Sequence, residues 1–116
     1  MVTIKDQGIL ENIITHCEKI QLKISTLTKE QYDANEENCD LVCFHILQIG
    51  ELVKHLTKEF SLTFSEVPWH KIARMRDKVA HGYDSIDSDE VWLIANNDVP
   101  VLNQYCKQIL ALAESK

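Results

Sequence analysis

Only three glycines and two prolines occur in the 116 residues of this chain. A many-stranded sandwich or barrel needs a turn signal roughly every 8–12 residues, and glycine and proline supply most of these signals. The chain therefore lacks the turn chemistry of such a fold, and we expect long helices with few breaks. A chain of this length has little room for a second core, so we expect a single helical domain over residues 1–116.

Composition and charge narrow the function classes. Hydrophobic residues make up 45% and charged residues 26%, which is ordinary for a soluble globular protein. The formal net charge of −6 argues against non-specific coating of DNA and against binding to an anionic membrane. The start lacks the apolar run of a signal peptide, and no stretch approaches the roughly 18 apolar residues that span a bilayer. We therefore expect a cytoplasmic protein.

Cysteine and histidine spacing gives no sign of a metal site. The chain has four cysteines, Cys17, Cys39, Cys43 and Cys106. The second and third are four residues apart, which is helical spacing rather than the spacing of a zinc knuckle. We expect reduced, mostly buried thiols. Four of the five histidines are scattered along the chain and form no ligand set: His16, His45, His55 and His70.

Apolar residues recur at helical spacing along most of the chain. One stripe runs from Leu10 to Leu27, and Thr28 with Gln31 fits a capping box for the next helix. A strongly apolar segment over residues 41–56 predicts a helix that is central in a bundle or buried at a subunit contact. The pattern favours an all-α, up-and-down bundle of four or five helices.

The second half of the chain predicts two further helices. Residues 60–67 form a connection, and Pro68 starts a helix that ends near Gly82. Asp87 begins a cap for the last helical stretch, in which Asp98 and Pro100 predict a break and restart. Trp69 and Trp92 are expected in the core.

Basic charge is concentrated on the helix over residues 69–81. Its four basic residues, against one acidic residue, give a net charge of +3 and leave −9 for the rest of the chain. These residues are Lys71, Arg74, Arg76 and Lys78, with Asp77. Such a local field draws in a phosphate even on an acidic protein.

Arg76 lies in the middle of an apolar stripe formed by Trp69, Ile72, Val79 and Tyr83. A guanidinium at such a position is costly unless it meets an anion. One interpretation is a structural ion pair with Glu51 of the preceding helix. The other is that Arg76 faces a cleft with another helix or subunit and holds a phosphate there.

His81 lies four residues after Asp77, a spacing at which the carboxylate can orient the imidazole. A histidine titrating near neutral pH suits general acid–base catalysis, although a lone histidine at a helix end is also favoured by the helix dipole. Arg76 and His81 are about 140° apart on an ideal helix. Either the helix end distorts at Gly82, or two copies of the helix combine.

Arg76-x4-His81-x-Tyr83 resembles the R-x4-H-x-Y motif of HEPN (higher eukaryotes and prokaryotes nucleotide-binding) domains, and of the HepT-like toxin family in particular. The resemblance covers nearly the whole chain. Its flanking matches are Ile49-Gly50-Glu51, Pro68-Trp69 through Ile72, Arg76-Asp77, His81-Gly82-Tyr83 and Val91-Trp92. It implies a homodimer whose motif helices face each other across a cleft.

The resemblance also implies a function. Members are metal-independent ribonuclease toxins of type VII-like toxin–antitoxin systems, paired with a minimal nucleotidyltransferase (MNT) antitoxin that can attach AMP to the motif tyrosine, here Tyr83. RNA supplies its own nucleophile, the 2′-hydroxyl. His81 would transfer the proton and Arg76 would stabilise the phosphorane. No metal or cofactor is expected, and the products should carry a 2′,3′-cyclic phosphate.

The other motif residues would support this reaction. Asp77 would orient His81 or bind a polar group, and Tyr83 would contact the phosphate or stack on a base. Lys71, Arg74 and Lys78 would position phosphates. The alternative is a non-catalytic helical subunit that binds nucleotide or substrate for a separate nucleotidyltransferase. A third interpretation is a plain dimerising bundle in which Arg76 is structural.

Overall fold

The computed structural model describes residues 2–81 and 87–114, with only the backbone given for His81 and Glu114. These residues form helices and no strand, which confirms the all-α prediction. The elements are α1 (Ile4–Ser25), α2 (Lys29–Ala34), α3 (Glu36–Lys54), α4 (Lys58–Thr63), α5 (Trp69–His81), α6 (Ser88–Leu93), the π-helical segment η2 (Ile94–Asp98) and α7 (Val99–Glu114). None of them is long and apolar enough to cross a membrane.

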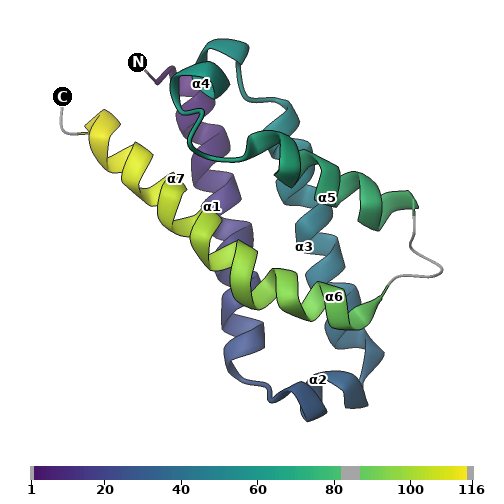
Figure 1. The fold of residues 1–116 in the computed structure, drawn as a ribbon. Helices are drawn as coiled ribbons and strands as arrows, with labels where there is room; N and C mark the ends of the chain where they lie inside the picture. Colours follow the sequence, from purple (N-terminus) through teal and green to yellow (C-terminus); the bar gives the residue numbers. More distant parts are fainter. Residues whose placement is uncertain (1, 82–86, 115–116) are drawn as a thin grey trace.

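Helix α3 is central, as its strongly apolar sequence predicts. It packs against α1 on one side and α5 on the other, and α7 crosses α1 (Figure 1). Its buried side chains repeat at three- and four-residue intervals: Val42, Ile46, Ile49 and Val53. The described chain is a flat, elongated body with extents of 47 × 28 × 20 Å.

Side-chain caps fix where several helices begin. The Thr28 hydroxyl accepts a hydrogen bond from the Gln31 N–H, and the Gln31 side chain accepts one from the Thr28 N–H, so the predicted capping box is confirmed. The carboxylate of Asp87 accepts from the backbone N–H groups of Asp89 and Glu90, as expected for the start of α6.

Two predictions about connections are wrong. Residues 60–67 are not an open connection, because α4 occupies the first part of them; Thr57 caps α4, and Phe60 is buried against Phe64 and Trp69. The predicted break near Pro100 is absent, since α6, η2 and α7 follow one another directly. The widened π turn comes just before Pro100, which has no N–H to donate.

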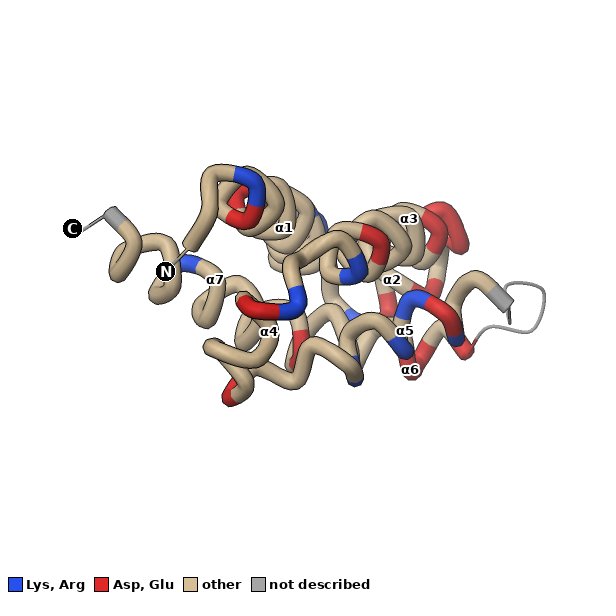
Figure 2. Tube along the Cα trace, turned by 90° about the horizontal axis from the view of Figure 1, so that it is seen from above, with Lys and Arg blue, Asp and Glu red and all other residues tan. Residues whose placement is uncertain are grey.

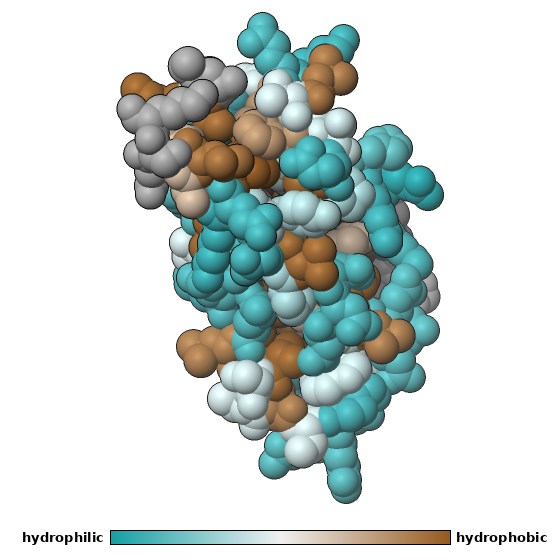
Figure 3. Space-filling view, turned by 60° about the vertical axis from the view of Figure 1, so that its left-hand side comes forward, coloured by the Kyte–Doolittle hydropathy of each residue, from teal (hydrophilic) through white to brown (hydrophobic). Residues whose placement is uncertain are grey.

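The thiols and tryptophans lie close to where the sequence places them. All four cysteines are buried and none forms a disulfide, although the Sγ atoms of Cys39 and Cys43 lie 3.8 Å apart in a thiol–thiol hydrogen bond. Burial raises the pKa of Cys106 to about 12. Trp69 is buried, whereas Trp92 is half-buried and packs on the Tyr32 ring at 4.8 Å. A few large hydrophobic side chains are exposed, among them Leu22 and Leu62. The face in Figure 3 shows several hydrophobic patches divided by hydrophilic surface.

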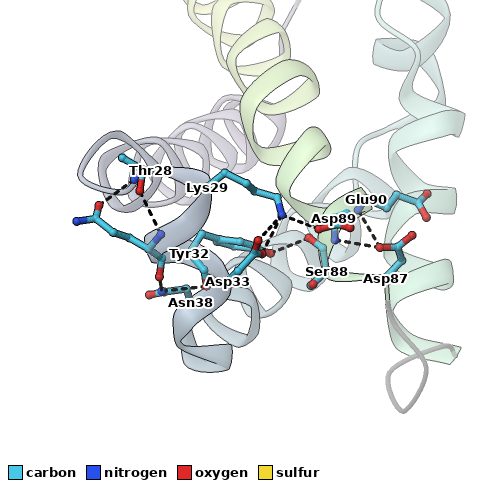
Figure 4. A network of polar contacts seen from close by, with 10 residues as sticks. Thr28, Lys29, Tyr32, Asp33, Asn38, Asp87, Ser88, Asp89 and Glu90 are labelled. Atoms are coloured by element: carbon cyan, nitrogen blue, oxygen red, sulfur yellow. Dashed lines mark hydrogen bonds and ion pairs between the residues drawn. The ribbon is translucent and has the colours of Figure 1, made fainter.

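A polar network joins α2 to the start of α6 (Figure 4). Lys29 Nζ lies 2.7 Å from Asp33 Oδ2 and 2.6 Å from Asp89 Oδ1, and the Tyr32 hydroxyl donates to the Ser88 carbonyl at 3.0 Å. These contacts hold the start of α6 against α2.

Candidate functional site

Arg76 lies where α5 packs closely against α3 at Gly50. A Cβ atom built on Gly50 would lie 2.0 Å from Arg76 Cβ and 2.6 Å from its Cγ. Only glycine at position 50 therefore permits this crossing. The close contact fixes the root of the Arg76 side chain and leaves the guanidinium to emerge at the edge of the α3–α5 seam.

The Arg76 guanidinium meets two carboxylates without being saturated by them. Its Nε atom lies 3.4 Å from Glu51 Oε2, and its Nη1 atom donates to Asp77 Oδ1 at 3.3 Å. The contact with Glu51 is the one named by the first of the two interpretations of Arg76. The Nε atom is buried but makes no hydrogen bond within the described residues, and the side chain keeps 30% of its surface exposed. Both contacts are long for charge-assisted hydrogen bonds.

Asp77 is engaged by cations from both helices. Its carboxylate accepts from Lys54 Nζ at 2.8 Å as well as from Arg76. The hydrogen bond from Lys54, with a smaller contribution from Arg76, lowers the pKa of Asp77. On the other side of the cluster, His55 Nε2 lies 3.8 Å from Glu51 Oε1. Glu51, Lys54, His55, Arg76 and Asp77 form one surface network, here called the seam network.

The other basic residues of α5 point in different directions. Lys78 forms an ion pair with Glu90 of α6. Lys71 lines a pocket against α7, and Arg74 is exposed. No carboxylate in the described part of the chain lies within ion-pair distance of Lys71 or Arg74. Basic segments gather along α5 in Figure 2, whereas acidic segments mark the start of α3.

The remaining motif residues are placed only in part. His81 is the last residue of α5, whose backbone stays helical up to that point. Arg76 and His81 therefore lie about 140° apart around a regular helix, and no distortion before Gly82 brings them together. Tyr83 and Gly82 lie outside the described residues.

The pairing of two histidines is not predicted from the sequence. His16 of α1 and His45 of α3 approach to 2.9 Å between their Nδ1 atoms, so one ring donates and the other accepts. Burial lowers the pKa of both imidazoles, with added effects of Lys19 on each and of His16 on His45. Each lies beside buried apolar positions of its helix, which was the available signal.

A second feature that went unnoticed is the buried Asp6, which is 1% exposed. Its carboxylate accepts from the Thr57 N–H at 3.0 Å, the Thr57 hydroxyl at 2.7 Å and the Thr3 hydroxyl at 3.1 Å. It thereby ties the start of α1 to the cap of α4. The spacing of Thr3 and Asp6, which is that of a helix cap, was the signal for half of this arrangement.

The all-helical fold and the helix that carries the Arg76–His81 motif are those of a HEPN-like protein. Comparison with known proteins identifies the family. A family model described as "Ribonuclease HepT-like" matches residues 13–109, so the chain belongs to the HepT-like ribonuclease family of HEPN domains. No solved structure gives a significant match.

Curated relatives agree with this assignment. The chain is 33% identical over 101 residues to "Putative RNase TTE0752" of Caldanaerobacter subterraneus subsp. tengcongensis, across 87% of this chain and 90% of the relative. It is 30% identical to "Putative RNase MJ0127" of Methanocaldococcus jannaschii, across 81% and 78% of the two chains. It is also 39% identical over 54 residues to "Probable ribonuclease HepT" of Thermococcus cleftensis, across 47% and 49%.

Proposed function

We propose that the chain is a metal-independent endoribonuclease toxin. It cleaves RNA by attack of the RNA's own 2′-hydroxyl on the adjacent phosphate. One observation carries the proposal: Arg76 is held at a glycine-lined helix crossing with long carboxylate contacts and a buried Nε atom that makes no hydrogen bond in the described chain. An arginine whose Cβ and Cγ atoms are fixed by packing, and whose guanidinium is not fully hydrogen-bonded, is suited to bind a phosphate whose charge grows in the transition state.

In this mechanism Arg76 stabilises the charged phosphorane, and His81 removes the 2′-hydroxyl proton and protonates the leaving 5′-oxygen. Substrate phosphate would compete with Glu51 for Arg76, because both are anions. Asp77 serves mainly to hold Arg76 through the seam network, since its described hydrogen bonds come from Lys54 and Arg76. Orientation of His81 by Asp77 remains a prediction.

The proposed enzyme is a homodimer. Because α5 is regular through His81, one helix directs its positions 76 and 81 to different sides. Two α5 helices facing each other bring the arginine of one copy near the histidine of the other. A symmetric contact of this kind is the commonest arrangement in soluble oligomers.

The proposed partner is an MNT-type nucleotidyltransferase antitoxin that blocks the enzyme, with Tyr83 as the site of AMP addition. A charged nucleotide on that tyrosine would occlude the cleft beside Arg76 and His81. Supplying the partner and ATP should therefore raise the mass of the wild-type chain by one AMP and leave Tyr83→Phe unchanged. An unmodified wild-type mass would point to inhibition by binding alone.

RNA cleavage by the purified chain tests the enzyme proposal. Wild-type protein should cut single-stranded RNA in the presence of EDTA and leave 2′,3′-cyclic phosphate ends. His81→Ala should lower the rate by about 10²–10⁴-fold, as loss of a general acid–base group does. Unchanged cleavage by His81→Ala would remove this residue from the mechanism.

Expression of the chain without a partner separates this proposal from the alternative of a non-catalytic subunit. A ribonuclease toxin should arrest growth, and Arg76→Ala should relieve the arrest at equal expression. Harmless accumulation of folded wild-type protein would favour the binding subunit.

A further inference from the structure

A pocket of about 390 Å³ lies on the other flank of α5, away from the seam network. It is enclosed by the segment before α5, the first half of α5, the end of η2 and the start of α7. Its lining residues are Glu66, Val67, Pro68, Lys71, Ile72, Met75, Asp98, Val101, Leu102 and Tyr105. The volume falls in the lower part of the range of small-molecule sites.

The pocket combines an apolar floor with a few polar groups. Val67, Ile72 and Leu102 are buried, and Met75 is half-buried beside them. The polar members are Lys71, Glu66 and Asp98, and within the described chain none of them has an ion-pair partner. Apolar walls with a small number of convergent polar groups are typical of a ligand site.

Tyr105 gives the pocket an aromatic wall. The residue is half-buried and lines both this pocket and an adjoining hollow of about 330 Å³, formed with Val101, Gln104 and Gln108. An aromatic ring that borders accessible space on α7 provides a surface on which a planar group can stack.

Asp98 comes from the one irregular helical turn of the described chain. It is the last residue of η2, where the Val99 N–H bonds to the Ile94 carbonyl in π-helical fashion. Such turns are frequent at functional sites. The carboxylate is half-buried at the pocket wall, so its oxygens are acceptors available at the edge of an apolar space.

We propose that this pocket receives a guanine base of single-stranded RNA, which extends the proposed ribonuclease function to a sequence preference. Guanine is the base whose Watson–Crick edge presents two adjacent N–H donors, matching one carboxylate such as Asp98. Tyr105 supplies the stacking surface, and Lys71 at the rim binds the attached phosphate. Uracil, cytosine and adenine leave the carboxylate with a single donor.

An RNA strand can run from the pocket to Arg76 along the exposed face of α5. Lys71 and Arg76 are five residues apart on α5, about 7.5 Å along its axis and about 140° around it. Around an ideal helix, Arg74 lies between the Lys71 side and the Asp77 side, on the exposed face. Arg74 is exposed, and no described carboxylate is paired with it. An RNA strand with its base in the pocket would thus pass around the exposed face of α5 over Arg74, so the phosphate at Arg76 would lie several nucleotides further along the strand.

Nucleotide binding to the full-length chain tests the pocket directly. In calorimetric titrations, 5′-GMP should bind at least about tenfold more tightly than AMP, CMP or UMP. Asp98→Asn should weaken GMP by about tenfold, and Tyr105→Ala by a similar factor, whereas Tyr105→Phe should retain binding. Lys71→Met should weaken GMP but not guanosine. Asn97→Ala, a change at an exposed neighbour on η2, is the matched control.

The outcomes separate this inference from the proposed function. GMP binding that is absent, equal for all four nucleotides, or unaffected by Asp98→Asn and Tyr105→Ala would overturn the guanine pocket, even if the protein cleaves RNA. Selective GMP binding lost in these variants would support the pocket, even if no cleavage is found. Circular dichroism of each variant confirms that it is folded.

Discussion

Asp6 and Arg76 are two charged groups that the fold treats in opposite ways. Asp6 is almost fully buried, and three donors from Thr3 and Thr57 surround its carboxylate at 2.7–3.1 Å. Arg76 has a partly exposed side chain, contacts its two carboxylates at 3.3–3.4 Å and keeps one buried N–H without a hydrogen bond in the described chain. Both charges lie at helix junctions.

The difference in hydrogen bonding between Asp6 and Arg76 indicates which of the two charges stabilises the fold. A buried charge that contributes to stability is saturated, because each unmet hydrogen bond costs free energy. A charge that is fixed at its root but incompletely satisfied at its head can accept a further anion. On this reasoning Asp6 is a structural group, and Arg76 fits the proposed role of binding a substrate phosphate.

The largest stability effect is expected at Asp6. Asp6→Ala leaves the Thr57 N–H and hydroxyl without their buried acceptor, so the free energy of unfolding should fall by about 3 kcal/mol. Asp6→Asn keeps one acceptor oxygen and should lose less. Urea unfolding followed by circular dichroism measures both, and equal stability of wild type and Asp6→Ala would break the comparison.

Gly50 should affect both fold and site. In Gly50→Ala the new methyl group meets Arg76 Cβ, so α5 must shift away from α3. Overpacking of this kind costs about 1–3 kcal/mol. At a temperature where Gly50→Ala is fully folded, we expect it to cleave RNA more slowly than wild type does. Unfolding cannot explain such a loss of rate. Gly8→Ala is the control, since nothing lies within 4 Å of a Cβ there. Wild-type cleavage by folded Gly50→Ala would show that the crossing does not position Arg76.

Loss of the Tyr32 hydroxyl should have a smaller effect. Tyr32→Phe removes the hydrogen bond to the Ser88 carbonyl and should cost about 1 kcal/mol. Lys29→Met, in the same network but at the surface, should leave the melting temperature unchanged, because exposed ion pairs contribute little. If Lys29→Met lowered the melting temperature more than Tyr32→Phe does, the surface ion pairs in Figure 4 would contribute more to stability than the Tyr32 hydrogen bond.

The histidine pair predicts a mild acid sensitivity. The native pKa values of His16 and His45 are lowered, so below the ordinary value of about 6.5 the unfolded chain binds more protons than the folded one. Stability should therefore be full above that pH and decline as the pH falls toward the native pKa values. Melting temperatures at about pH 7.5 and about pH 5.5 should differ more for wild type than for His16→Gln/His45→Gln. An identical difference would exclude the pair as its source.

Sequence patterns anticipated the features that depend on local chemistry. The capping box at Thr28, the cap at Asp87 and the central position of α3 follow from spacing and polarity. Contacts between distant segments could not be predicted in this way. The meeting of His16 with His45, of Asp6 with Thr57 and of Gly50 with Arg76 depends on how helices cross, which no local pattern encodes.

The connections were missed for a related reason. The α4 turn depends on Phe60 packing against Trp69, and the π turn of η2 replaces a break that Asp98 and Pro100 alone suggest. In both cases tertiary packing decides between conformations that the local sequence leaves open.

Rate of RNA cleavage and melting temperature, measured on one preparation of Arg76→Ala, test the role of this arginine most directly. The account predicts a rate about 10²–10³-fold below wild type in EDTA, with a melting temperature much closer to wild type than that of Asp6→Ala. A melting temperature as low as that of Asp6→Ala, or cleavage at the wild-type rate, would contradict this account. Arg76 would then be a structural ion-pair residue.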